Sequence, residues 1–321
     1  MSDHAVLAEA IQKRYGEKCA LDRFDLAVRK GTVHGLLGPN GAGKTTAVRV
    51  LATLLRFDGG RAEVAGIDVA RDPRRVRGRI GLTGQYAAVD EILTGRQNLE
   101  MFGRLFHLGG KRAALRAGEL LERFDLVDAG NKGVAEYSGG MRRRLDLAAS
   151  MILAPDVLFL DEPTTGLDPR GRGEVWDAVR ALVAGGTTVL LTTQYLDEAD
   201  KLASHITVID RGRAIADDTP DGLKNRVGGD RIEVVVGETS DLAVAVKTVA
   251  RVAKGEPETV ESERRVHAVV TDRVAALTEV ARTLQDEGIG VEDIGLRRPS
   301  LDDVFLRLTG HRTETTEEKA A

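Results

Sequence analysis

The segment from Gly38 to Thr45 has the residue types and spacing of a loop that binds phosphate. It reads Gly38-Pro39-Asn40-Gly41-Ala42-Gly43-Lys44-Thr45. The glycines let successive backbone N–H groups turn towards phosphate oxygens, while Lys44 adds a positive charge and Thr45 offers a hydroxyl to Mg²⁺. An apolar run, 33–37, precedes the loop and a helical pattern, 46–55, follows it, which is the context this motif requires. The sequence therefore predicts a nucleotide site here rather than a glycine-rich turn without a ligand.

Two adjacent carboxylates, Asp161 and Glu162, follow the apolar run 157–160. The carboxyl ends of parallel strands are where such sheets bind ligands. We expect Asp161 to hold Mg²⁺ through water and Glu162 to orient and polarise the water that attacks the terminal phosphate. The alternative, an exposed acidic strand end, is disfavoured by the phosphate-binding loop upstream.

Between these motifs lies Tyr137-Ser138-Gly139-Gly140-Met141, followed by a helical pattern over 142–153. A serine hydroxyl and glycine N–H groups at a helix N-terminus form a second anion cradle. Here the chain resembles the ABC ATPases, whose signature is usually Leu-Ser-Gly-Gly-Gln, and it departs at the first and last positions. The resemblance implies a head-to-tail homodimer, with each ATP between one phosphate loop and the partner's signature. The alternative is a capping serine without a ligand.

Further landmarks of that family follow in order. Gln85, after the apolar run 80–83, matches the Q-loop, which is expected to sense Mg²⁺ and the γ-phosphate and to couple to a membrane subunit. The run Thr165-Gly166-Leu167-Asp168 matches the D-loop and places Asp168 at the dimer interface. Tyr15 stands where family members stack an aromatic ring on adenine, although a tyrosine at a strand end also serves in cores and on surfaces.

The departure with chemical consequences is Gln194, where most of the family has a histidine. Its amide can hydrogen-bond a γ-phosphate but cannot carry a positive charge or shuttle a proton, which shifts the catalytic role to Glu162. The alternative is a solvent-exposed loop glutamine. The resemblance thus implies a catalytic set of Glu162, Lys44, Gln194 and Gln85, a magnesium set of Thr45, Gln85 and Asp161, and an ATP-binding set of Tyr15, Gly38, Pro39, Asn40, Gly41, Ala42, Gly43, Lys44, Thr45 and Thr46.

The segment Leu191 to Asp200 resembles the daunorubicin-resistance type of ABC ATPase, and so does Pro299 to Gly310 near the C-terminus. In that group the second segment ends a small domain implicated in dimer assembly. It is equally an amphipathic helix in which Leu301, Val304, Phe305 and Leu308 close that domain's core.

These motifs need elements that position them. Short apolar runs at 33–37, 80–83, 157–160, 188–192 and 206–209 predict buried strands of a largely parallel sheet, with antiparallel edge strands near the N-terminus and a helical subdomain at about 90–150. The ATPase domain is expected over 1–227, an α+β domain of split βαβ type over 228–310, and a disordered polar tail over 311–321.

Composition narrows the partners. A net charge of -4 and a pI of about 6.0 supply no basic field for nucleic acid. A single cysteine and an N-terminus without a signal-peptide pattern favour the cytosol, and no apolar run reaches the ~20 residues of a membrane span. We therefore expect a peripheral subunit at the cytoplasmic face of the membrane that uses ATP and Mg²⁺ to drive drug export through a separate, ABC-2-like permease. Open alternatives are export of lipid, polysaccharide or ions, and a soluble ABC ATPase outside transport.

Overall fold

The computed structural model describes residues 3–84, 87–227, 230–297 and 299–309. Its contacts divide the chain into two compact units, 1–220 and 221–321. The division falls at the start of helix α8 (Pro220–Val227), whereas the boundary predicted from sequence lies at its end. The predicted Q-loop residue Gln85 and the predicted tail 311–321 lie outside the described residues.

The first unit is built on a six-stranded sheet of order β10-β9-β3-β8-β7-β6. Its strands are β3 (Val33–Leu37), β6 (Ile80–Thr83), β7 (Val157–Asp161), β8 (Thr188–Thr193), β9 (His205–Asp210) and β10 (Arg213–Asp218). All neighbouring pairs are parallel except β9 with β10. Every residue of β3, β7 and β8 is buried, as expected for parallel strands covered on both faces. The predicted strands and fold class are confirmed.

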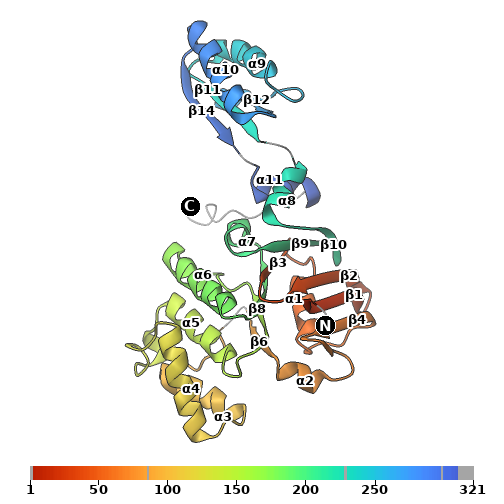
Figure 1. Cartoon of the computed structure of the whole chain (residues 1–321), viewed down its shortest axis with the longest axis vertical. Coiled ribbons are helices and arrows are strands. Elements are labelled where there is room, and N and C mark those ends of the chain that lie inside the picture. The colour runs from red at the N-terminus through yellow and green to blue at the C-terminus, as the bar shows by residue number, and fades with distance from the viewer. Residues whose placement is uncertain (1–2, 85–86, 228–229, 298, 310–321) are drawn as a thin grey trace. The chain divides into compact units, whose positions relative to one another are not determined.

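An antiparallel sheet of order β2-β1-β4-β5 lies beside this layer (Figure 1). It consists of β1 (His4–Tyr15), β2 (Lys18–Arg29), β4 (Gly59–Val64) and β5 (Ile67–Asp68). Helix α1 (Lys44–Leu51) buries its apolar side in a core shared with β1, β2, β4 and residues Val157 and Phe159 of β7. The start of α1 is thereby fixed at the carboxyl end of β3.

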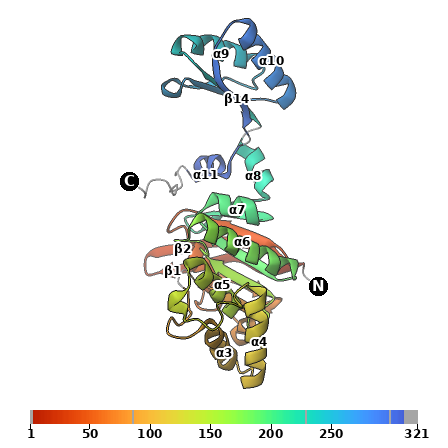
Figure 2. The same ribbon diagram turned by 90° about the vertical axis from the view of Figure 1, so that its left-hand side faces the viewer.

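Helices fill the interval between β6 and β7. They are α3 (Gly95–Leu105), α4 (Gly110–Arg123), the 3-10 turn η1 (Val134–Glu136) and α5 (Gly139–Ser150). Helix α6 (Pro169–Ala184) packs on α5, and α7 (Leu196–Leu202) follows β8, while the short α2 (Pro73–Arg77) precedes β6. Figure 2 shows α3, α4 and α5 gathered at one end of this unit. No described helix is long and apolar enough to cross a membrane.

The second unit is an antiparallel sheet of order β12-β13-β11-β14. Its elements after α8 are β11 (Arg231–Val236), η2 (Thr239–Asp241), α9 (Leu242–Ala250), β12 (Glu258–Val260), η3 (Glu261–Glu263), β13 (Arg265–Val269), α10 (Arg273–Asp286), β14 (Val291–Arg297) and α11 (Leu301–Thr309). Alternate residues of β11 and β13 enter a core with α9 and α10. In α11, Leu301, Val304 and Phe305 are buried but are not among the residues of this core, and Leu308 is 38% exposed. The prediction that these four residues close the core of the small domain is therefore not confirmed.

A buried histidine on β3 makes the stability of the first unit depend on pH. The His34 side chain is 1% exposed, and its Nε2 lies 2.8 Å from the Thr207 hydroxyl. Burial lowers the pKa of His34 from 6.5 to about 4. In the unfolded chain this histidine is protonated below about pH 6.5, whereas in the folded chain it stays neutral down to about pH 4. Because the unfolded state binds the extra proton, the free energy of unfolding falls as the pH falls from about 6.5 to about 4.

We expect His34→Gln to remove this pH dependence. Between neutral pH and about pH 5, the free energy of unfolding of the wild-type chain should fall by about 2 kcal/mol more than that of the variant. Urea unfolding followed by the fluorescence of Trp176, the only tryptophan, reports on the first unit alone. His107→Asn, at an exposed histidine, should keep the wild-type dependence. Equal losses in His34→Gln and wild type would contradict the assignment.

Candidate active site

The glycine-rich loop joins the end of β3 to α1, and its backbone requires glycine at specific places. Gly43 has a φ of +114°, and a Cβ there would lie 2.6 Å from the Ala20 carbonyl oxygen. A Cβ on Gly38 would lie 2.3 Å from the Ile209 carbonyl oxygen. These positions therefore cannot take a side chain without moving the backbone.

Lys44 is the first residue of α1 and is 5% exposed. Its ammonium donates to the Gly38 carbonyl at 2.7 Å and to the Pro39 carbonyl at 3.2 Å, and it lies 4.0 Å from Glu162 Oε1. Burial lowers the pKa of Lys44, while the carboxylates of Glu162 and Asp161 raise it. The Lys44 ammonium group thus contacts the carbonyls of the loop that would bind phosphate.

The two predicted carboxylates meet the loop at the same sheet edge. Asp161 is the last residue of β7, and its Oδ1 accepts hydrogen bonds from the Thr192 hydroxyl at 2.5 Å and the Thr45 hydroxyl at 3.3 Å. Glu162 follows, with Oε2 accepting from the Thr165 hydroxyl at 3.4 Å. Thr192 was not in the predicted site. Only the register of β7 with β8, which pairs Asp161 with Thr192, brings it there.

The donor set suits Mg²⁺. Among the described residues, no group of three or more His, Cys, Asp or Glu side chains could hold a metal ion on its own. Mg²⁺, however, is usually bound by one or two protein oxygens together with water and substrate phosphates. The adjacent oxygens of Thr45 and Asp161 supply that minimal set.

A hollow of about 350 Å³ lies against the loop. Its lining residues are Tyr15, Lys18, Ala20, Asn40, Gly41, Gly43, Lys44, Thr45, Thr46 and Glu162. Tyr15 ends β1, is 46% exposed and lines the hollow, and its contact with adenine stays a prediction. Lys18 and Ala20 were missed, because they enter the hollow only through the pairing of β1 with β2. Gln194 is half-buried just after β8 and does not line this hollow.

The signature segment forms a second hollow of about 550 Å³. It is lined by Ser138, Gly139, Gly140, Met141, Arg144, Gly166, Leu167, Asp168, Arg170, Gly171 and Glu174. Ser138 caps α5, its hydroxyl accepting from the Met141 N–H at 3.2 Å, and Asp168 caps α6, its carboxylate accepting from the Gly171 N–H at 2.7 Å. Tyr137 instead is buried, with its hydroxyl bonded to the Ala129 carbonyl. The two hollows have no described lining residue in common, so one chain does not join them.

Sequence comparison finds known proteins that match this chain over its whole length. The family model for the ABC transporter matches residues 21–165, and one for the C-terminal domain of DrrA1-3-like ATP-binding proteins matches 219–309. The daunorubicin resistance ATP-binding protein DrrA2 of Streptomyces coeruleorubidus is 82% identical over 100% of both chains. The chain belongs to this family of ABC transporter ATP-binding proteins. It is an ABC ATPase, and ATP hydrolysis is its activity.

More distant relatives and a solved structure also match most of the chain. The daunorubicin/doxorubicin resistance protein DrrA of Streptomyces peucetius is 49% identical over 98% of this chain and 96% of its own. The Nod factor export ATP-binding protein I of Ralstonia nicotianae is 40% identical over 94% of this chain and 92% of its own. The crystal structure of a nucleotide-free ATP-binding cassette from an ABC transporter has a TM-score of 0.64 at 26% identity, covering 69% of this chain and 94% of that one.

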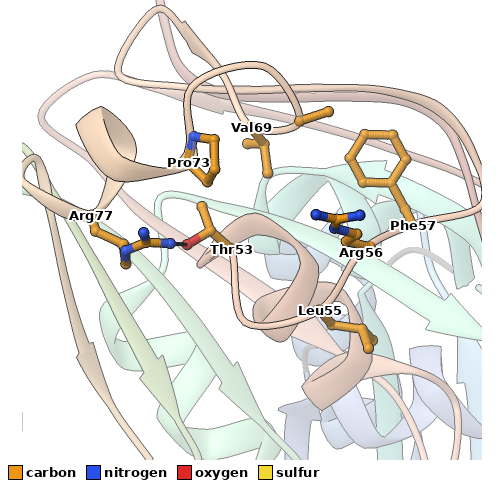
Figure 3. Close-up of a pocket in the computed structure, with 8 residues that line it drawn as sticks. Thr53, Leu55, Arg56, Phe57, Val69, Pro73 and Arg77 are labelled. Atoms are coloured by element: carbon orange, nitrogen blue, oxygen red, sulfur yellow. Dashed lines mark hydrogen bonds between the residues drawn. The ribbon is translucent and has the colours of Figure 1, made fainter.

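The ABC ATPase has a further pocket, of about 490 Å³, away from both hollows (Figure 3). It lies between the end of α1 and α2 and is lined by Thr53, Leu55, Arg56, Phe57, Val69, Ala70, Pro73 and Arg77. Arg77 closes one side by donating to the Thr53 hydroxyl at 3.1 Å. None of the predicted site residues lines it.

Proposed function

We propose that this chain is the ATP-hydrolysing subunit of an exporter for daunorubicin-like anthracycline drugs. The observation that carries the catalytic part is the meeting of Lys44, Thr45, Asp161 and Glu162 at one sheet edge. The 82% identity to a daunorubicin resistance protein, extending through the C-terminal domain, supports the cargo class.

Each residue of the site takes a role from its position. The loop N–H groups and Lys44 bind the phosphates, Tyr15 stacks on adenine, and Thr45 with Asp161 would hold Mg²⁺. The bound ion supplies positive charge that offsets charge developing on the transferred phosphoryl group. Glu162 accepts a hydrogen bond from the attacking water, aligning it with the terminal phosphate. Gln194 would complete the set by donating its amide N–H to the γ-phosphate, and Gln85 by contacting Mg²⁺.

The separate hollows favour a homodimer. The signature hollow presents exposed Ser138 and Gly139 at the start of α5, where N–H groups and the helix dipole attract anions. Within the described chain this cradle has no nucleotide loop beside it. We propose that a second copy supplies that loop, so that each ATP lies between Lys44 of one copy and Ser138 of the other.

ATP hydrolysis by this dimer would be coupled to a separate permease, which the dimer would bind at the cytoplasmic face of the membrane. We place its docking surface on the segment from Gln85 to Phe106. Within the described part of that segment, Ile92 is 91% exposed, Leu105 63% and Phe106 46%. Apolar side chains so exposed are typical of surfaces that a partner covers.

We expect Ile92→Asp to weaken permease binding. A carboxylate at the centre of an apolar contact loses its hydration without gaining a partner, and permease recovery with the tagged chain from detergent extracts should fall at least about tenfold. Leu115→Asp, at a leucine on α4 that is 67% exposed but outside the segment, is the matched control. Similar losses in both variants, or in neither, would contradict this placement.

The cargo is tested by transport. Cells expressing the chain together with its permease should accumulate less daunorubicin than cells whose chain carries Glu162→Gln. A second candidate cargo is the Nod-factor class, because a relative named for Nod factor export is 40% identical over 94% of this chain. Unchanged drug accumulation in an assembled, ATP-hydrolysing complex would remove the drug assignment.

A further inference from the structure

Arg143 on helix α5 is a buried guanidinium that binds three main-chain carbonyls. It is 6% exposed. Its Nε donates to the Pro163 carbonyl at 2.7 Å, Nη1 to the Gly84 carbonyl at 2.7 Å, and Nη2 to the Glu162 carbonyl at 3.4 Å. One side chain thus joins the signature helix, the end of β6 and the loop after β7.

Glu162 has a strained backbone. Its φ is +50°, in the left-handed region that a residue with a Cβ rarely adopts. Such a residue keeps this conformation only where its surroundings hold it, and strain of this kind collects at functional sites. On one side the Glu162 N–H donates to the Thr192 carbonyl at 3.0 Å. On the other side the Glu162 carbonyl accepts from Arg143 and from the Thr165 N–H at 3.3 Å.

The charge of Arg143 is paired with the carboxylate of Asp146. Asp146 lies one turn further along α5, with Oδ2 at 3.3 Å from Arg143 Nη1, and its Oδ1 accepts from the Ala88 N–H at 2.9 Å. Burial lowers the pKa of Arg143, while Asp146, Glu198 and Asp161 raise it. Asp146 therefore pairs with the guanidinium and orients it, and the two side chains contact the main chain at Gly84 and Ala88, on either side of Gln85 in sequence.

We propose that Arg143 is a positioning residue for ATP hydrolysis. It fixes the left-handed backbone of Glu162 and so directs the carboxylate towards Lys44 and the phosphate loop. Because α5 begins at the Ser138 cap, the same helix that would meet the partner's ATP also sets the position of this chain's Glu162. The inference rests on the proposed role of Glu162.

The first test is the kinetics of Arg143→Lys in the full chain assembled with its permease. Lysine keeps the charge but cannot bind three carbonyls at once. A displacement of Glu162 of the order of an ångström should lower kcat by about ten- to a hundredfold while the KM for ATP stays within about twofold. The matched control is Arg116→Lys on α4, whose guanidinium likewise binds the Met151 and Ile152 carbonyls but does not contact Glu162. Its kcat should not change.

Asp146→Asn is the second variant, in case Arg143→Lys unfolds. It keeps an acceptor for the Ala88 N–H and removes the charge that aims Arg143, so kcat should fall by a smaller factor with KM again unchanged. A fall in kcat no larger than that of Arg116→Lys in both variants would overturn the proposal. So would a rise in KM that accounts for the whole loss in kcat/KM.

A double-variant cycle separates this proposal from the assignment of Glu162. If Arg143 acts through Glu162, Arg143→Lys should cause little further loss of single-turnover rate in a Glu162→Gln background. The same fractional loss in both backgrounds would overturn the positioning role while leaving Glu162 as proposed. A Glu162→Gln chain that turns over as fast as wild type would instead remove the role of Glu162 itself.

Discussion

Glu162→Gln should lower ATP turnover by about a hundred- to ten-thousandfold, the range that a residue activating the nucleophile contributes. The amide keeps the size and the hydrogen bond from Thr165, but it accepts more weakly from water and cannot attract its proton. Because Gln194 carries no ionisable group, it cannot act as a general base in place of the carboxylate. ATP affinity should remain, since Lys44 and the loop are unchanged.

Turnover is measured as phosphate release from the assembled complex, and affinity with a fluorescent ATP analogue. Glu122→Gln, at an exposed glutamate on α4, should behave as wild type. The variant should also accumulate as an ATP-bound dimer, because closure no longer ends in hydrolysis. Turnover that persists in Glu162→Gln would show that another group activates the water.

The second large effect is expected from mixing two inactive chains. Lys44→Ala removes the cation from the phosphate loop, and Ser138→Arg fills the signature hollow with a long side chain. Each homodimer should lose nearly all turnover. In a head-to-tail heterodimer both defects fall in one site, and the other site joins an intact loop to an intact signature.

An equimolar mixture should therefore regain roughly a quarter of the wild-type rate, since half of its dimers are heterodimers with one intact site each. A mixture of Lys44→Ala with Lys44→Ala/Ser138→Arg is the control and should stay inactive, as its dimers contain no intact loop. If each chain completed its own site, mixing the two single variants would restore nothing.

The parts of the site that consist of a few consecutive residues could be predicted from local sequence motifs. The loop from Gly38 to Thr45 and the pair Asp161 and Glu162 could be placed at strand ends because buried parallel strands are short, uninterrupted apolar runs. Helix limits were less accurate. Helix α1 begins at Lys44 and ends at Leu51, whereas the pattern predicted 46–55, since the loop geometry and not periodicity decides where the helix starts.

Residues that act through tertiary pairing could not be found this way. The run from Arg142 to Arg144 reads as a charged, solvated helix face, and nothing in its spacing marks the middle arginine as buried. Only the packing of α5 against the ends of β6 and β7 takes Arg143 inside, where three carbonyls replace its water. Tyr137 is a second example, because the first residue of the predicted signature segment has a buried side chain, which its place in the motif did not indicate.

The two hollows share no lining residue in the described part of the chain, and if they are the two halves of one nucleotide site, as proposed, activity depends on the concentration of chains in a cell. In the proposed homodimer, the fraction of paired half-sites would depend on the concentration of chains by mass action, so untethered copies would hydrolyse less ATP when they are dilute. Copies held by one membrane complex meet instead at an effective concentration on the order of millimolar. By holding two copies together, the permease would raise their effective concentration, and chains that are not bound to a permease would hydrolyse little ATP.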